Sequence, residues 1–597
     1  MDQPLWRWDA TAVAAAIRTR KISSREATQA VLGRLETVNP KLNAVTVVLA
    51  EQALAAADRA DAALRRGEAP GLLHGVPVTI KENVDQEGQA TANGVVAFKD
   101  VIAATDSPPV AAWRRAGAVI VGRTNTPAFS LRWHTDNDLR GRTFNPWHRD
   151  RTPGGSSGGC AAALAAGIAP LGHGNDLGGS VRYPAYCCGV AGIRPTLGRI
   201  AAHNATVAEE RPVGTQLMSV QGPLARRVAD VRLGLAAMST RDPRDPWWAP
   251  APLEGPPVVR PIRVALTVDP SRQGVHPDVA AAVRAAGAAL ADAGYAVEEV
   301  EPPDVAGVAA CWSTIVINEL RHVTQPYIRK HGGVDINRSL DFTLAGTADV
   351  DLPGYMKALG ERSKHVRDWM LFLERYPLVV GPVSTEPPFQ VGFDTSTAER
   401  SREVSRAQRL LVAVNLLGLP AVAVPAGRAG GLPMGVQVIG SRYREDLSGR
   451  RRGRRGAPRP ADADRSGALM PPKSAVRTEE APAPFQGAPY SQAIRCGDFV
   501  FVSGQLPLSP AGEVVGATIQ EQTEQVLRNL AAILKASGSG LDRLVKTTVF
   551  LVDFADFAGM NDVYRKHVGD VPPARSTVAV KEFPRGARIE IEAIASL

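Results

Sequence analysis

Hydrophobic positions recur with a helical period near the start of the chain. Ser23 and Glu26 have the spacing of a capping box, in which each side chain binds the other residue's backbone N–H. Apolar residues then follow at three- and four-residue intervals, at Ala27, Val31, Leu35 and Val38. The pattern predicts an amphipathic helix over residues 24–38, and an alanine-rich stretch predicts another over residues 51–66.

A period of two follows in the stretch GLLHGVPVTIKENVD. Val76, Val78 and Ile80 alternate with other positions, the last of which is Lys81, so we expect a strand that ends at Lys81 on the side opposite its apolar face. Similar short apolar runs lie at residues 118–121, 263–268, 377–380, 421–424 and 435–439, with helical patterns such as residues 277–293 between them. Strands of this kind between helices indicate an α/β sheet buried on both faces, and we expect one large α/β domain over residues 1–447.

The pattern breaks at residue 448. Residues 448–474 hold almost no large apolar side chains and many Arg, Pro and Gly, so they cannot bury enough surface to order themselves, and we interpret them as a linker. A second globular pattern begins at about residue 475. Its strands are expected at residues 499–503, 546–552, 576–580 and 588–594, and its helices at residues 518–536 and 557–568. They predict a small α+β domain over residues 475–597.

Composition places the chain among ordinary globular proteins. Its 597 residues are 44% hydrophobic and 22% charged, which excludes fibrous and wholly disordered classes. The formal net charge is +9, but arginines 450, 451, 452, 454 and 455 supply five of these charges, which leaves about +4 for the rest. Because the linker has no aromatic residue that could stack on bases, we expect no nucleic-acid partner.

The chain shows no targeting or metal-binding pattern. No apolar run approaches the length of about 18 residues that a membrane span needs, and no signal peptide is recognisable, so we expect a cytoplasmic protein without a membrane partner. The cysteines are odd in number and lack CxxC spacing, which argues against a disulfide framework and a zinc site: Cys160, Cys187, Cys188, Cys311 and Cys496. We therefore expect neither a cofactor nor a metal.

Two glycine-flanked serines, Ser156 and Ser180, carry the candidate chemistry. Glycine beside serine permits backbone angles and close approaches that a nucleophile's loop requires. The GGSSGG run lacks the Lys and Ser or Thr of a phosphate-binding loop. It formally matches the GxSxG elbow of α/β-hydrolases, which would need an acid and a late histidine, and His322, His331 and His365 are available.

The residues carry a resemblance to a known family. With TPGGSSGG at 152–159, GNDLGGSVR at 174–182 and Lys81 in GVPVTIKENVD, the first domain resembles the amidase-signature family, whose members hydrolyse amides with a Ser-Ser-Lys triad on a mixed, helix-covered sheet. Ser156 lies 24 residues and Lys81 lies 99 residues before Ser180, as the family pattern requires. The resemblance continues through GLPAVAVPAG at 418–427 and GLPMGVQVIG at 431–440.

The resemblance implies a role for each of these residues. Ser180 would be the nucleophile, Ser156 a bridging serine preceded by a cis peptide, and Lys81 the base, which must be neutral and hence desolvated. An acyl-enzyme would form and be hydrolysed, releasing ammonia or an amine. The backbone N–H groups of Leu177, Gly178, Gly179 and Ser180 would stabilise the oxyanion.

Other positions near the nucleophile qualify this picture. Asp176 and Arg182 would hold the loop, although a purely structural ion pair explains them equally well. Asn175 stands where threonine is frequent in the family, and neither it nor Leu177 is expected to touch the triad. The ammonia-supplying amidotransferase of the same family is an alternative. The stretch GIRPTLGRIAAHN lacks the tyrosine associated with the amidase-like chain of that enzyme, which favours a free-standing amidase.

The second domain resembles the Rid (YjgF-like) family of enamine and imine deaminases, which have a chorismate-mutase-like fold. The resemblance rests on GAPYSQA, VSGQLPL, PPARSTV and RIEIEAIA. It implies a 2-iminobutanoate/2-iminopropanoate-type deaminase in which Arg575 binds a carboxylate, Glu590 holds the hydrolytic water, and Tyr490, Ser503 and Asn561 line the pocket. Composition alone would make Glu590 part of a solvated strand face.

The same resemblance leaves the role of the second domain open. Members of this family form trimers with pockets between subunits, so we expect a homo-oligomer, with a trimer through this domain as its candidate form. A trimerising or metabolite-binding module without activity is the alternative, and a scaffold with an idle first domain is disfavoured by the intact spacing of the three triad residues.

The linker suggests one further hypothesis. Amidase-signature chains usually continue from a segment like RYREDL into an apolar helix, whereas here the chain enters SGRRRGRRG. Arg-, Gly- and Pro-rich sequence is what GC-rich coding DNA yields out of frame, and Met470 stands where an initiator of the second domain would. We therefore consider that a frame shift joined two reading frames.

Overall fold

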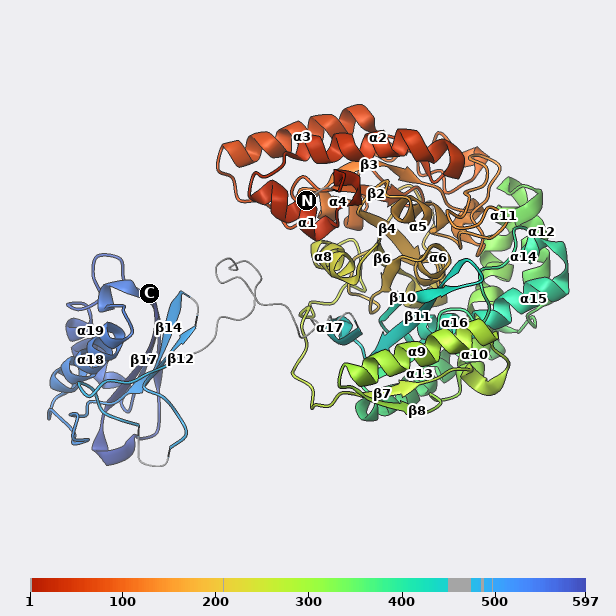
Figure 1. Cartoon of the computed structure of the whole chain (residues 1–597). Coiled ribbons are helices and arrows are strands. Elements are labelled where there is room, and N and C mark those ends of the chain that lie inside the picture. The colour runs from red at the N-terminus through yellow and green to blue at the C-terminus, as the bar shows by residue number, and fades with distance from the viewer. Residues whose placement is uncertain (1–2, 208, 449–473, 485–487, 497) are drawn as a thin grey trace. The chain divides into compact units, whose positions relative to one another are not determined.

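The computed structural model describes residues 3–597 except 208, 449–473, 485–487 and 497. Within it the chain forms two compact units, Met1–Arg455 and Gly456–Leu597, which are described separately (Figure 1). The predicted linker falls almost entirely outside the described residues. No helix in the described part is long and apolar enough to cross a membrane.

A mixed sheet forms the centre of the first unit. Among the described residues its eleven strands lie in the order β1-β3-β2-β4-β6-β5-β10-β11-β9-β7-β8. Their bounds are β1 Val45–Val48, β2 Pro77–Lys81, β3 Val119–Thr124, β4 Leu171–Asp176, β5 Ala191–Arg194, β6 Val220–Ala225, β7 Arg263–Leu266, β8 Ala296–Glu299, β9 Leu378–Pro382, β10 Ala421–Ala429 and β11 Leu432–Gly440. β2 runs parallel to both β3 and β4, and β7 runs parallel to β8 and β9, whereas the strands between β4 and β9 pair antiparallel. The expected α/β class with a mixed sheet is confirmed.

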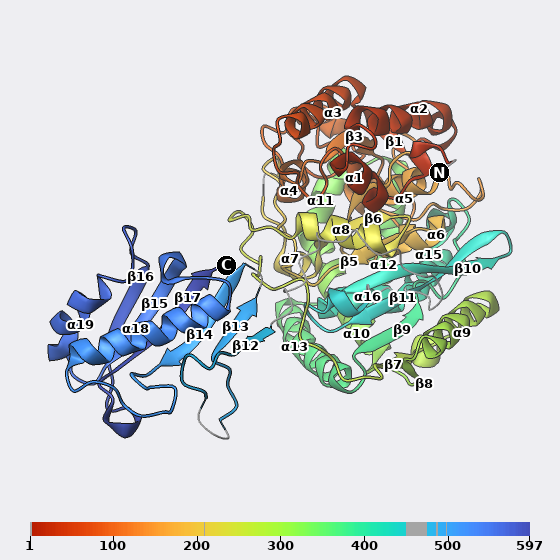
Figure 2. The same cartoon turned by 60° about the vertical axis from the view of Figure 1, so that its left-hand side comes forward.

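Helices cover both faces of this sheet (Figures 1 and 2). They are α1 Ala10–Arg18, α2 Ser24–Leu42, α3 Ala50–Arg65, α4 Pro108–Arg115, α5 Gly158–Ala165, α6 Arg182–Cys188, α7 Val213–Met218, α8 Val228–Met238, α9 Pro277–Asp292, α10 Val305–Glu319, α11 Gln325–His331, α12 Val334–Ala345, α13 Leu352–Arg375, α14 Phe393–Ser396, α15 Ala398–Ala407, α16 Arg409–Leu417 and α17 Glu445–Ser448. Val264 and Leu266 of β7 pack in the same cluster as α9, while Ala265 between them packs in the cluster of α10 and α16. Successive residues of one strand thus serve two cores, as the short apolar runs predicted.

The start of α2 follows the sequence pattern closely. The Ser23 side chain accepts from the N–H of Glu26, and the Glu26 carboxylate accepts from the N–H of Ser23, so the predicted capping box is confirmed. The helix continues beyond the predicted residue 38 to Leu42 and is followed by Asn43, which adopts a left-handed conformation that asparagine tolerates.

The central strand β4 was not predicted from the sequence. Its residues, LGHGND, carry two glycines and no continuous apolar run. The glycines are required by packing, because a Cβ on Gly172 would lie 2.5 Å from Cys160 Sγ and a Cβ on Gly174 would lie 2.7 Å from Ser157 Oγ. Helix α5 therefore packs closely against this strand and brings the two serine loops near each other.

Among its described residues, the second unit forms a six-stranded sheet with its helices on one side (Figure 2). Its strands are β12 Ser474–Val476, β13 Ala493–Cys496, β14 Phe499–Gln505, β15 Leu544–Leu551, β16 Ala574–Ala579 and β17 Ile589–Ser596, in the order β12-β13-β14-β17-β15-β16. Its helices are α18 Ile519–Ala536 and α19 Phe557–Tyr564, the latter shorter than predicted. Val500 and Val502 of β14 are buried in the core under these helices, while Phe499 and Phe501 are 44% and 45% exposed on the other face. The expected α+β domain is confirmed.

Candidate active site

Lys81 ends strand β2 in the interior of the first unit. Its side chain is fully buried, and Nζ lies 2.7 Å from both Ser156 Oγ and Asn175 Oδ1. Burial lowers the pKa of Lys81 to about 7, although Cys160 and Asp176 nearby favour the charged form. The site thus makes an amine that is substantially neutral near pH 7 and hydrogen-bonded to a serine.

Ser156 lies in a tightly packed loop that leads into α5. The Gly155–Ser156 peptide is cis, and Gly154 has a positive φ of 81°. A Cβ on Gly155 would lie 2.3 Å from the carbonyl oxygen of Arg132, so only glycine fits there. The N–H of the following residue, Ser157, donates to the carbonyl oxygen of Ser180 at 3.2 Å and joins the two serine loops.

Ser180 follows β4, in the turn that leads into α6. The carboxylate of Asp176, at the end of β4, accepts from the N–H of Gly179 at 2.9 Å and from that of Val181 at 3.1 Å. Gly179 has a φ of 94°, which favours glycine. A buried acidic side chain therefore closes the turn on both sides of Ser180.

The backbone N–H groups of this turn differ in availability. The N–H of Gly179 is already used by Asp176. Those of Leu177, Gly178 and Ser180 have no hydrogen-bond partner within the described part of the chain. Of the four N–H groups predicted as oxyanion donors, the one of Gly179 is therefore already paired with a side chain of the protein.

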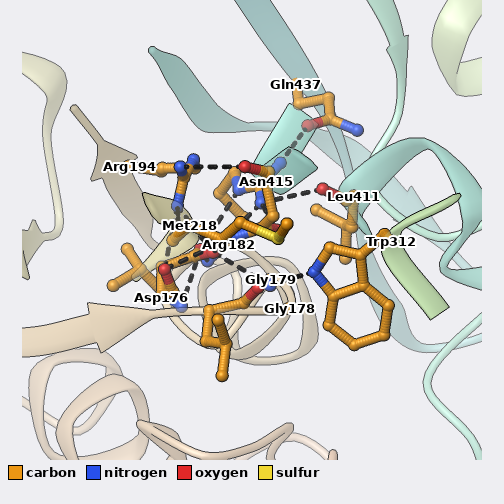
Figure 3. A network of polar contacts seen from close by, with 12 residues as sticks. Asp176, Gly178, Gly179, Arg182, Arg194, Met218, Trp312, Leu411, Asn415 and Gln437 are labelled. Atoms are coloured by element: carbon orange, nitrogen blue, oxygen red, sulfur yellow. Dashed lines mark hydrogen bonds and ion pairs between the residues drawn. The ribbon is translucent and has the colours of Figure 1, made fainter. Parts of the chain in front are cut away.

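Asp176 is the centre of a buried polar network (Figure 3). Arg182 donates to both of its oxygens at 3.1 Å, and Asn415 Nδ2 donates to Oδ1 at 2.8 Å. Arg194 donates to its backbone carbonyl at 2.9 Å. Burial opposes ionisation, but the guanidinium groups of Arg182 and Arg194 prevail and hold the pKa of Asp176 far below its ordinary value. Asp176 and Arg182 therefore support the loop and form an ion pair at once.

Sequence reasoning missed most partners in this network. Arg194, Asn415 and Gln437 come from β5, α16 and β11, and Gln437 Oε1 accepts from Arg182 at 2.9 Å. No local motif marks them, because each contacts Asp176 or Arg182 only through the fold.

The expectation that Asn175 stays clear of the triad is wrong. Besides accepting from Lys81, Asn175 donates from Nδ2 to Asn83 Oδ1 at 2.9 Å, and Asn83 in turn donates to Ser130 Oγ at 2.9 Å. Asn175 immediately precedes Asp176 at the end of β4, and β4 pairs with β2, the strand that ends at Lys81. The side chain of Asn175 is long enough to reach the Lys81 amine, whereas the shorter side chain of a threonine would end farther from it.

The histidines of the elbow hypothesis lie elsewhere. His322 binds Asp349 at 2.7 Å, and His331 packs on the ring of Tyr327. Within the described residues, no histidine side chain hydrogen-bonds to Ser156 or Ser180. The geometry therefore favours the lysine over a histidine as partner of the serines.

Ser156 and Ser180 open into a cavity of about 1800 Å³. Its lining includes several aromatic side chains, among them Phe98, Phe129, Trp133, Trp312 and Tyr327. Phe98 stacks on Tyr327 with ring centroids 5.4 Å apart and meets Phe129 edge-on at 6.0 Å. A wall of this kind suits a flat apolar group.

The residues predicted for a site in the second unit do not all meet within one chain. Arg575 donates to Asn561 Oδ1 at 2.9 Å and lies over the ring of Tyr564, on the helix-covered side of the sheet. Ser503 donates to the carbonyl of Ser491 at 2.7 Å, and the half-buried Glu590 lies over Gly504. Glu590 alternates with buried Ile589 and Ile591 and so faces the open side of the sheet, while Tyr490 is 44% exposed in the loop before β13.

Burial and the neighbouring Glu592 raise the pKa of Glu590. In the described part of either unit, no group of three or more His, Cys, Asp or Glu side chains could hold a metal ion.

Comparison with known proteins assigns each unit to a family. A family model described as Amidase matches residues 26–447, and one described as Endoribonuclease L-PSP, which corresponds to the Rid-like domain, matches residues 478–597. The indoleacetamide hydrolase of Bradyrhizobium diazoefficiens is 50% identical over 446 residues, which are 74% of this chain and 85% of that protein. The amidase-like chain of the glutamyl-tRNA(Gln) amidotransferase of Moorella thermoacetica is 33% identical over 72% of this chain and 92% of its own length.

A solved structure agrees with these matches. The 6-aminohexanoate cyclic dimer hydrolase in complex with its substrate superposes with a TM-score of 0.64 at 28% identity, over 74% of this chain and 95% of that one.

Proposed function

The chain belongs to the amidase family, and from this premise we propose that its first unit cleaves a carboxylic amide with Ser180 as nucleophile, Ser156 as bridging group and Lys81 as base. The observation that carries the proposal is the 2.7 Å hydrogen bond between Lys81 Nζ and Ser156 Oγ, in a site that lowers the pKa of the amine to about 7. A lysine can accept a proton only when it is neutral, and this burial supplies that form.

The proposed reaction moves one proton along two serines. Ser180 Oγ attacks the amide carbon while its proton passes to Ser156 Oγ, whose own proton passes to Lys81. The relay then returns a proton to the leaving nitrogen, the C–N bond breaks, and ammonia or an amine departs from the acyl-enzyme. Water, deprotonated by the same relay, cleaves the ester and restores Ser180.

The oxyanion of each tetrahedral intermediate needs donors that are fixed in advance. The N–H groups of Leu177, Gly178 and Ser180 are unpaired within the described residues, and Gly178 and Ser180 are buried at the cavity. The network around Asp176 holds the turn that carries them, so we assign Asp176 and Arg182 to positioning.

We propose a primary amide of an aryl- or indolylacetic acid as substrate. The aromatic wall formed by Phe98, Phe129, Trp133, Trp312 and Tyr327 suits such a ring. The relative named indoleacetamide hydrolase is 50% identical to this chain over the aligned residues, against 33% for the amidotransferase chain. The higher identity favours a free-standing hydrolase.

For the second unit we propose hydrolysis of an enamine or imine to a carbonyl compound and ammonia, at a pocket shared by two copies. Arg575 and Asn561 would bind a carboxylate, and Ser503, Tyr490 and Glu590 would come from a neighbouring chain. The support is that Arg575 and Glu590 lie on opposite faces of one sheet, so a single copy does not join them. The raised pKa of Glu590 suits a group that exchanges protons with water.

The test is ammonia release by the purified full-length chain. It should hydrolyse indole-3-acetamide and phenylacetamide without any other protein, and Ser180→Ala and Lys81→Ala should abolish this activity. An amidase that works only when the other amidotransferase chains are added would instead support the alternative. Hydrolysis of 2-iminobutanoate that survives Ser180→Ala and is lost in Arg575→Ala would support the second activity. If the second unit assembles but hydrolyses no imine, it is a trimerising or metabolite-binding module without this activity.

A further inference from the structure

Two tryptophans bind successive carbonyl groups of the nucleophile turn. Trp312 Nε1 donates to the carbonyl oxygen of Leu177 at 3.2 Å, and Trp133 Nε1 donates to that of Gly178 at 2.8 Å. Both rings also lie next to Gly178, since a Cβ added there would be 3.2 Å from Trp312 Cζ2 and 3.9 Å from Trp133 Cζ2. Figure 3 shows Trp312 beside this turn.

Each carbonyl shares a rigid peptide plane with the next N–H. In a trans peptide the two groups point in opposite directions, so a bond that fixes one also fixes the other. Trp133 thus fixes the plane whose N–H, that of Gly179, donates to Asp176. Trp312 fixes the plane of the Gly178 N–H, which is buried and has no partner within the described residues. Because buried N–H groups are rarely left unpaired, this group is available for a ligand.

We propose that Trp133 and Trp312 are positioning residues that together set the direction of the Gly178 N–H for the oxyanion, in addition to lining the acyl pocket. Trp312 fixes the peptide plane that contains this N–H, and Trp133 fixes the next plane, on the other side of Gly178. The inference rests on the proposed function, because it assigns a geometry to that reaction's oxyanion site. The two indole rings also line the cavity, so a substrate ring that packs on them contacts the same side chains that align the Gly178 N–H.

The surroundings hold Trp133 firmly in place. The preceding residue, Arg132, makes two hydrogen bonds of 2.9 Å to the carboxylate of Asp394 and is only 4% exposed. The backbone of Trp133 lies against Gly155, beside the bridging serine. The segment therefore contacts the Ser156 loop through its backbone and the Ser180 turn through its indole.

Trp312 comes from a different part of the fold. It lies on α10, which packs on α16, and α16 supplies Leu411 and Asn415 to the network of Asp176 and Arg182. Two separate segments of the chain thus fix two adjacent peptide planes. Side chains that only lined the pocket would not need to bind these carbonyl groups.

The experiment replaces each indole N–H and separates kcat from KM. In Trp312→Phe and Trp133→Phe, kcat for phenylacetamide should fall about tenfold, because a looser donor stabilises the oxyanion less, while KM stays within about threefold. The matched control is Trp369→Phe. Trp369 is fully buried and, like Trp133 and Trp312, donates to a backbone carbonyl, that of Pro303 at 2.7 Å, but it does not line the cavity, so kcat should stay unchanged.

A second measurement isolates the N–H from the volume of the ring. Incorporation of 3-benzothienylalanine at position 312 keeps a bicyclic ring and replaces the N–H by sulfur. Inhibition by benzylboronic acid, which forms a tetrahedral adduct on a serine, should weaken by the same factor as kcat falls.

The outcomes separate the inference from the proposed function. If Ser180→Ala remains active, the proposed function fails. If Ser180→Ala is inactive but the variants at positions 133 and 312 change only KM, or keep kcat and boronate affinity within about threefold of the control, the tryptophans are wall residues alone and the inference is overturned.

Discussion

Lys81 is buried by the fold and keeps two polar partners, a serine hydroxyl that can exchange a proton with the amine and an amide oxygen that only accepts a hydrogen bond. Its Nζ contacts Ser156 Oγ and Asn175 Oδ1 at 2.7 Å, and burial brings its pKa to about 7. An exposed lysine would be almost wholly charged at that pH and could not act as a base.

The first prediction concerns pH. The fraction of neutral Lys81 grows as the pH rises through its pKa of about 7, so kcat/KM should rise along a limb with its midpoint near that value and then level off. The measurement is kcat/KM for phenylacetamide across the pH range in which the protein stays folded. A flat profile, or a midpoint near the ordinary lysine pKa of about 10, would contradict the assignment.

Asn175 supplies the second prediction. Its Oδ1 accepts a hydrogen bond from the amine and so favours the charged form, which means that Asn175→Ala should lower the pKa of Lys81 and move the rising limb to lower pH. The maximal rate should also fall, by about tenfold, because the amine loses a positioning contact. Asn175→Thr, which keeps a hydroxyl acceptor, is the matched variant and should retain more activity. An unchanged pH profile in Asn175→Ala would show that the contact is irrelevant to the amine.

At this scale the sequence identified residues that sit in motifs and missed those that do not. Lys81, Ser156 and Ser180 were predicted from the resemblance to the amidase-signature family, whose motif spacing they match. Asn175 was visible as an unusual residue, but its contact depends on how far the side chain reaches between the ends of β4 and β2. Trp133 and Trp312 gave no local signal, since they meet the turn from distant segments.

Strand β4 and helix α5 show how elements position the site. The strand runs from Leu171 to Asp176, and α5 packs against its Gly172. A search for alternating apolar residues does not find such a strand. Glycine stands at the positions where the neighbouring helix packs closely, so the apolar side chains that would mark a strand are missing there. The apolar strands β2, β7 and β9, in contrast, followed directly from the sequence.

The third prediction tests this packing. Gly172→Ala places a Cβ 2.5 Å from Cys160 Sγ and 2.8 Å from Thr79 Oγ1, both fully buried, so it should destabilise the first unit by about 1–3 kcal/mol. Gly33→Ala is the control, since nothing lies within 4 Å of its added Cβ on the exposed side of α2, and it should be neutral or stabilising by up to about 1 kcal/mol. Urea denaturation compares the two, and equal stability would refute the close packing of α5 on β4.

The whole molecule joins units that match two family models, Amidase and Endoribonuclease L-PSP, in one chain. The composition change at residue 448 predicts a junction there. Residues 449–473 are outside the described part, so the junction, the linker and the frame-shift hypothesis stay predictions. The coding DNA tests the latter: an apolar helix in another frame after residue 447 would support it, and its absence would remove it.

The fourth prediction concerns assembly through the second unit. The open face of its sheet carries Phe501, which is 45% exposed, side by side with the half-buried Ile494 and Ile594 on the two neighbouring strands, and we propose that another copy covers this apolar row. We expect the chain to be a homo-oligomer, with the trimer as the proposed state, and Phe501→Glu to yield monomers that keep amidase activity. Light scattering after gel filtration measures the mass. Val571→Glu, at a position that is 87% exposed and outside the strands, is the control and should leave it unchanged; a monomeric wild type would contradict the proposal.

The most direct test of the central claim is to find the acylated residue during turnover. The full-length chain is mixed with phenylacetamide, quenched in acid during steady state, digested, and mapped by peptide mass spectrometry. We expect a phenylacetyl group on Ser180, and on no other residue. Turnover with the acyl group on a different side chain, or with full activity in Ser180→Ala, would contradict it.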